Sequence, residues 1–137
     1  MTLDPLEDII SQMEDKRLFG LRGAVCCKNE AVDIELRVAQ LFDVLVTANG
    51  LADTDFVSLV FSVTSDLTAI NPAAALRKSG RGADLALFCC TEPKVENSLP
   101  KVIRVLIHYY AADGTIPKHV YLNGAEVLRP DRSALED

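Results

Sequence analysis

Three arginines stand in or next to apolar segments that have the composition of β-strands. Arg104 lies in the middle of KVIRVLIHYY (Lys101–Tyr110), Arg22 lies in LFGLRGAVCC (Leu18–Cys27), and Arg129 follows VYLNGAEVL. A guanidinium keeps its proton in a protein, and a buried one without a partner costs roughly 3–5 kcal/mol. We therefore expect each arginine either to reach water at the edge of a sheet or to face an anion.

A fourth arginine and a carboxylate are weaker candidates for ligand contacts. Arg77 lies in a short segment with helical spacing, and Glu92 follows the apolar run ADLALFCC (Ala83–Cys90). A carboxylate at the end of a buried strand can accept a hydrogen bond from a ligand hydroxyl. Taken alone, however, Arg77 is better explained as a solvated helix residue and Glu92 as an ordinary loop acid.

The motifs that the sequence lacks narrow the chemistry. It has no recognisable Ser-His-Asp arrangement, no phosphate-binding loop, no GxGxxG and no HExxH. His108 and His119 lie near aromatic residues in strand-like runs, where histidines usually pack. The pattern favours a small molecule with carboxylates that is handled electrostatically, without a covalent nucleophile.

Length and composition set the outer limits. The chain has 137 residues, enough for one domain, and 49% of them are hydrophobic. A formal net charge of -6 argues against nucleic-acid binding. The sequence contains no run of 18 apolar residues, so no membrane span is predicted. The acidic N-terminus does not resemble a signal peptide, and a cytoplasmic location is therefore expected.

Four cysteines occur as two adjacent pairs, Cys26-Cys27 and Cys89-Cys90. Neighbours on a strand point to opposite faces, so one pair cannot easily chelate one metal ion. The spacing does not match zinc-binding CxxC patterns either. We expect reduced, buried core cysteines, with a redox or ligand-contact role as the lesser alternative.

Periodicity and turn signals predict a mixed β-sheet with packed helices, an α+β fold. Asn29 is expected to cap a helix over Asn29–Asn49, and Asn71 one over Ala73–Lys78. Gly23 is expected either to let a ligand or a backbone approach beside Arg22, or to mark a bulge on an edge strand. A short acidic helix is predicted over Pro5–Asp15. The predicted strands are Leu18–Cys27, Asp55–Thr64, Ala83–Cys90, Lys101–Tyr110 and His119–Leu122, with a short return strand at Ala125–Leu128. The composition of Lys101–Tyr110 predicts a strand that is covered on both faces.

Four segments, taken in their order along the chain, resemble the sequence pattern of one protein family. LRGAV, TSDLTAINPAAALR, LPKVIRVLIH and HVYLNGAEVLRPD together resemble the AroH-type monofunctional chorismate mutases, from about Leu18 to Asp131. The resemblance implies a single domain over residues 18–131, between an acidic N-terminal extension at 1–17 and a polar tail at 132–137. It also implies a pseudo α/β-barrel homotrimer with active sites between subunits. The family rearranges chorismate to prephenate, on the way to phenylalanine and tyrosine, without cofactor or metal.

The resemblance also assigns roles to matching positions. Arg22 would grip a substrate carboxylate, Arg104 would contact the ether oxygen and a carboxylate, Glu92 would accept a hydrogen bond from the ring hydroxyl, and Tyr121 would bind the side-chain carboxylate. Arg77 would reach across the subunit interface. The other positions implied to line the substrate are Asn71, Ala73, Ala74, Leu87, Phe88, Cys89, Cys90, Thr91, Leu128 and Arg129.

Three positions depart from the family pattern. The family usually has phenylalanine at the position of Asn71, often lysine or another polar residue at that of Ala74, and often a small residue at that of Phe88. We hypothesise that Phe88 replaces the aromatic wall lost at Asn71. A paralogue that has lost turnover and binds a carboxylated metabolite as a sensor is the alternative. Another trimeric enzyme, of the RidA-type imine deaminases, is a third possibility that the HVYLNGAEVLRPD segment disfavours.

Overall fold

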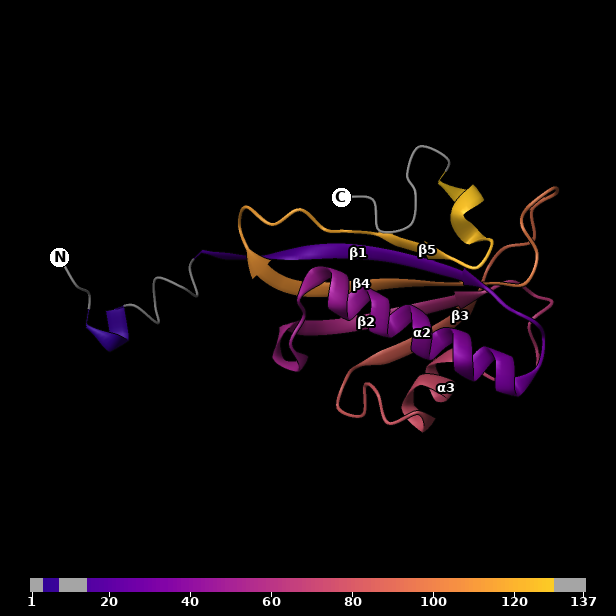
Figure 1. Ribbon diagram of the computed structural model, residues 1–137, viewed down its shortest axis with the longest axis horizontal. Helices are drawn as coiled ribbons and strands as arrows, with labels where there is room; N and C mark the ends of the chain where they lie inside the picture. The colour runs from indigo at the N-terminus through magenta and orange to yellow at the C-terminus, as the bar shows by residue number, and fades with distance from the viewer. Residues whose placement is uncertain (1–3, 8–14, 130–137) are drawn as a thin grey trace.

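The computed structural model describes residues 4–7 and 15–129, whose main feature is one mixed five-stranded sheet (Figure 1). The strand order is β3-β2-β4-β1-β5. β4 runs antiparallel to both β1 and β2, whereas β5 is parallel to β1 and β3 is parallel to β2. The mixed sheet predicted from the sequence is therefore confirmed. The strands are β1 Lys16–Cys26, β2 Phe56–Val63, β3 Leu87–Thr91, β4 Val102–Ala112 and β5 Val120–Leu122.

Two helices, α2 (Ala31–Asn49) and α3 (Pro72–Lys78), pack together on one face of this sheet (Figure 1). Ion pairs join them, from Lys78 to Glu35 at 2.9 Å and from Arg81, just beyond α3, to Asp43 at 2.7 Å. We call this side of the sheet the helix-covered face. No helix in the described part of the chain is long and apolar enough to cross a membrane, and the cytoplasmic location stays a prediction.

The helix-covered face holds the core. Every second residue of the central strands points toward α2, including Leu21 and Ile107, and both are fully buried. Gly23 belongs to this face. A Cβ at Gly23 would lie 2.8 Å from Leu45 Cδ1 and 3.1 Å from Leu41 Cδ1, so the glycine lets α2 pack closely on β1. The close approach of another element that was expected at Gly23 is therefore that of α2, and the alternative of a bulge on an edge strand was wrong.

The opposite face of the sheet is covered by neither α2 nor α3, and we call it the open face. Its central residues are Arg22 and Ala24 of β1, Arg104 and Leu106 of β4, and Ser62 of β2, which the strand registers set side by side. In this single chain β4 is thus covered on one face, not on both as predicted. Because β4 lies between β2 and β1, Arg104 is not an edge residue, and the alternative of an arginine at a sheet edge is also wrong.

The helix caps agree with the sequence at one helix and differ at the other. The side chain of Asn71 accepts hydrogen bonds from the backbone N–H groups of Ala73 and Ala74, as expected for the cap of α3. The cap residue of α2 is Glu30, without a side-chain cap bond. Asn29 instead accepts hydrogen bonds from the backbone of Thr68 and Ala69 and ties two loops together.

Other boundaries need correction. Ala125–Leu128 forms a 3₁₀ helix, η2, not a return strand. Asn123 and Gly124 both have positive φ, which turns the chain sharply, and the Gly124 N–H donates to Glu126 at 2.7 Å. The third strand begins at Leu87, because Ala83–Ala86 form no strand. A second 3₁₀ helix, η1 (Asp53–Asp55), precedes β2. Pro5–Glu7 are helical, and the rest of the predicted N-terminal helix lies outside the described residues.

Candidate active site

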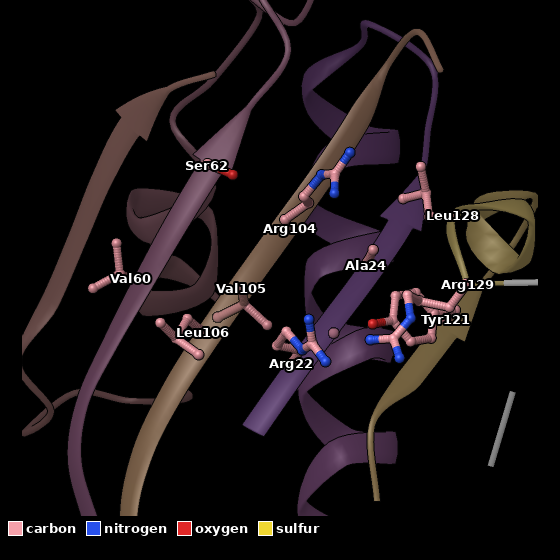
Figure 2. Close-up of a pocket in the computed structure, with 11 residues that line it drawn as sticks. Arg22, Ala24, Val60, Ser62, Arg104, Val105, Leu106, Tyr121, Leu128 and Arg129 are labelled. Carbon is pink, nitrogen blue, oxygen red and sulfur yellow. The ribbon is translucent and has the colours of Figure 1, made fainter. Parts of the chain in front are cut away.

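A pocket of about 270 Å³ lies on the open face (Figure 2). Its floor is formed by β2, β4 and β1, and one wall by β5, η2 and the residue after η2. Three of the residues that line it are arginines and none is acidic, so the pocket suits an anionic ligand. The lining residues are Arg22, Gly23, Ala24, Val60, Ser62, Arg104, Val105, Leu106, Tyr121, Leu128 and Arg129.

Arg104 is held at the pocket by a carboxylate. Its Nε lies 2.7 Å from Oε1 of Glu92, the residue that follows β3, and the Ser62 hydroxyl donates to the same oxygen at 2.9 Å. The side chain of Glu92 is 16% exposed and that of Arg104 44% exposed. The ion pair uses Nε, so the terminal nitrogens of the guanidinium are not needed to hold Glu92. A charged fork fixed in this way can engage two ligand oxygens.

Arg22 enters the pocket from β1, the strand beside β4. Its cross-strand partner is Leu106, and Ala24, two residues on, pairs with Arg104. Its backbone N–H donates to Nδ1 of His119 at 2.9 Å, which ties β1 to the residue before β5. The two arginines therefore project from neighbouring strands on one face and converge on one cavity (Figure 2).

The third side of the pocket comes from the C-terminal part of the described chain. Tyr121 of β5 pairs with Ala24 of β1 and is 5% exposed, within a small apolar cluster that also contains Val102 and Ala125. Because η2 turns back over this cluster, Leu128 and Arg129 reach the same cavity. A 3₁₀ turn, and not a return strand, thus brings Leu128 and Arg129 to the pocket.

The predicted site residues of the α3 region lie elsewhere in this chain. Arg77 and Ala74 are exposed on α3, Ala73 is buried beneath it, and Asn71 caps it. All four belong to the helix-covered side, so the sheet separates them from the pocket of the same chain.

The β3 residues divide between the two faces. Leu87 and Cys89 pack against the core on the helix-covered face, whereas Phe88 pairs with Val60 and Cys90 with Ser62 on the open face. Phe88 and Cys90 are exposed and do not line the pocket. Thr91, also exposed, ends the strand just before Glu92.

The expectation of buried cysteines was right only in part. Cys27 is buried, Cys26 and Cys89 are half-buried and Cys90 is exposed, and all four are free thiols. Burial, reinforced by Asp33, raises the pKa of the Cys27 thiol to about 11. Burial also raises the pKa of Cys89. Neither thiol is ionised at neutral pH, which speaks against a nucleophilic role for them.

Sequence reasoning missed several residues of the pocket, above all Ser62. Its signal was present in the alternation of FVSLVFSV, which places Val60 and Ser62 on one face. The register was needed to show that this face also carries Arg104, because Ser62 and Arg104 are cross-strand partners. Val60 and Leu106 add apolar surface to the floor beside the arginines.

The pocket can bind a compact anion, shield it on an apolar surface and present fixed cations to it.

The sequence is similar to that of known proteins over most of its length. Residues 18–132 match the family described as chorismate mutase type I. The chorismate mutase AroH of Bacillus subtilis is 32% identical over 119 residues, which cover 83% of this chain and 91% of that protein. The AroH enzyme of Thermus thermophilus is 35% identical, over 82% of this chain and 93% of its own.

A solved structure is similar as well. A chorismate mutase from Clostridium thermocellum superimposes with a TM-score of 0.70 at 38% sequence identity. The match covers 80% of this chain and 98% of the other. The structural similarity therefore extends over nearly the whole chain of that chorismate mutase.

Proposed function

The chain belongs to the type I chorismate mutase family, and from this premise we propose how its open face carries out the family reaction. It is an isomerase that converts chorismate to prephenate, a step of aromatic amino acid biosynthesis. The proposal concerns which residues act. The observation that carries it is the convergence of Arg22, Arg104 and Tyr121 on one cavity, with Glu92 held against Arg104.

The reaction is a pericyclic rearrangement, which needs no acid, base or nucleophile. The protein has to hold a compact conformer in which the two carbons that will bond lie close together. Chorismate carries two carboxylates, and Arg22 and Tyr121 hold one of them at the β1–β5 side of the pocket. Arg129 and Leu128 close the mouth above it. Val60 and Leu106 provide the apolar surface against which the ring lies.

Arg104 stabilises the charge that develops in the transition state. Negative charge grows on the ether oxygen as its bond to carbon breaks, and a fixed cation aimed at that oxygen lowers the barrier. Arg104 is fixed because it stands on a central strand and because Glu92 engages its Nε at 2.7 Å. Glu92 accepts a hydrogen bond from the ring hydroxyl with its remaining oxygen. The site thus binds the substrate at both ends while its central cation faces the breaking bond.

The complete site forms between subunits of a homotrimer. The open face exposes several large apolar side chains, among them Leu18, Tyr110 and Phe88, at 47%, 48% and 66%. Such a surface is typical of an interface. Arg77 lies on the helix-covered side of its own chain, so a neighbouring subunit has to supply the Arg77 that completes the pocket. Asn71 and Ala74, which are exposed at the same helix, reach the substrate in the same way.

Phe88 lies beside the pocket and does not line it in its own chain. It lies on the open face beside Val60, a residue of the pocket floor. Its place on the same face as the pocket is compatible with compensation for Asn71, which stays a hypothesis. Asn71 in turn is engaged as the cap of α3.

The experiment is to follow the loss of chorismate absorbance with the purified protein. The proposal predicts turnover without added metal or cofactor. No turnover, together with retained binding of a prephenate-like dicarboxylate, would support the sensor paralogue instead. The interface site has its own test, which is to mix the inactive Arg77→Ala and Arg104→Ala variants under conditions of subunit exchange. Recovered activity is expected, and none would place the site within one chain.

A further inference from the structure

Ser62 stands between two charged residues of the site, Arg104 and Glu92. On β2 it pairs with Arg104 of β4 on one side and with Cys90 of β3 on the other. Its hydroxyl donates to Oε1 of Glu92 at 2.9 Å. The backbone N–H of Glu92 donates to the carbonyl of Val63 at 2.8 Å, so the strand that carries Ser62 also anchors the main chain of Glu92.

Both protein donors meet the same carboxylate oxygen. Arg104 Nε lies 2.7 Å from Oε1 of Glu92, and Ser62 Oγ lies 2.9 Å from it. A carboxylate oxygen has about two lone-pair directions, so two donors occupy Oε1 fully. A third donor, such as a ligand hydroxyl, is left with Oε2. The two bonds also fix the rotation of the carboxylate about its last torsion, because they approach from neighbouring strands.

We propose that Ser62 is a positioning residue, which saturates Oε1 of Glu92 and thereby reserves Oε2 for the substrate hydroxyl. The inference rests on the proposed role of Glu92 in binding that hydroxyl. Without the Ser62 hydroxyl, Oε1 has a vacant acceptor site and the carboxylate can turn about its contact with Arg104. The substrate hydroxyl can then donate either to Oε2 or to the vacant acceptor site on Oε1. Ser62 acts only through Glu92, so its effect is confined to ligands that carry the hydroxyl.

The test uses two probes, an oxabicyclic dicarboxylate that mimics the transition state and carries the ring hydroxyl, and its deoxy counterpart. Calorimetry measures both affinities for the wild type and for Ser62→Ala. We expect Ser62→Ala to weaken the hydroxylated probe about tenfold, the usual effect of losing a hydrogen bond to a charged group, and to leave the deoxy probe unchanged. Ser62→Thr, which keeps a hydroxyl, should restore the difference in affinity between the two probes. Ser62→Val, which has the shape of threonine without the hydroxyl, should not.

Ser58→Ala is the matched control. Ser58 lies on the same strand and face, and its hydroxyl contacts His108 Nδ1 at 3.1 Å, outside the pocket. Its removal should change neither affinity.

The outcomes separate this inference from the proposed function. Equal weakening of both probes by Ser62→Ala, or no weakening of either, would overturn the role of Ser62 alone. The same holds if Ser62→Val matches Ser62→Thr. A wild type that binds both probes equally would overturn the proposed role of Glu92 and this inference with it. A wild type that binds neither probe would overturn the proposed function as a whole.

Discussion

The two faces of the sheet are built from the same strands and serve different ends. On β1, Leu21 and Val25 point into the core under α2, whereas Arg22 and Ala24 point to the open face. On β4, Ile103 and Ile107 alternate in the same way with Arg104. The helix-covered face is apolar and closely packed. The open face carries the pocket with its three arginines, and half-exposed apolar residues beside it.

If the proposed roles hold, rigidity and reactivity are supplied from opposite sides of one backbone. Arg104 need not be deeply buried to be fixed, since the residues before and after it are locked in the core. Changes on the open face should alter catalysis with little effect on stability, and changes on the helix-covered face should do the reverse.

The largest effect is expected for Arg104→Ala. Removing the cation that we propose to face the breaking bond should lower kcat by at least about 10²–10³-fold, the usual loss for a preorganised electrostatic contact. The fold should persist, because no core side chain changes. Stopped-flow or steady-state chorismate assays measure the rate, and circular dichroism and light scattering check the fold and the assembly.

Arg81→Ala is the matched control. Arg81 also pairs with a carboxylate at 2.7 Å, that of Asp43, but on the helix-covered side. It should keep near-normal kcat. An equal loss of activity in both variants would show that the two faces are not separable.

Leu45→Ala probes the other face. Leu45 is fully buried beneath β1, and its truncation should reduce the free energy of unfolding by about 2–5 kcal/mol. Denaturant unfolding at a fixed protein concentration measures the loss, since an oligomer's stability depends on concentration. The fraction that remains folded should turn over chorismate at close to the wild-type kcat. A large fall in kcat for the folded protein would contradict the division of labour.

Gly23→Ala should have a smaller effect of the same kind. The new methyl group would lie 2.8 Å from Leu45 Cδ1 and 3.3 Å from Val105 Cγ1, so α2 or its side chains must shift. Overpacking of this size costs about 1–3 kcal/mol. Thermal unfolding measures it, and Gly20→Ala, whose methyl group would meet only Leu106 at 3.8 Å, is the comparison. If both variants unfold alike, close packing of α2 is not the reason for Gly23.

Much of the fold and part of the site followed from the sequence. Periodicity located α2, and the Asn71-Pro72 pair located the start of α3, because their local signals agree with the final packing. The prediction of a short strand at Ala125–Leu128 was wrong, because Asn123 and Gly124 have positive φ and turn the chain into a 3₁₀ helix. A two-residue turn signal does not reveal which element follows it.

The site was predictable where a charge interrupts an apolar strand, as at Arg22 and Arg104, since such a charge demands an explanation. It was not predictable where the residue is ordinary. Ser62 and Gly23 have meaning only through the register of β2 with β4 and the height of α2 above β1. Those are tertiary facts that no local pattern contains.

The central claim is that Arg104 acts through a fixed guanidinium fork on the open face and not through charge alone. Arg104→Lys tests it most directly, because lysine keeps the charge and loses the fork. The account predicts a fall in kcat/KM of about 10²-fold or more, about 2.7 kcal/mol of transition-state stabilisation, with the melting temperature unchanged. A lysine variant that retains near-wild-type kcat/KM would contradict it.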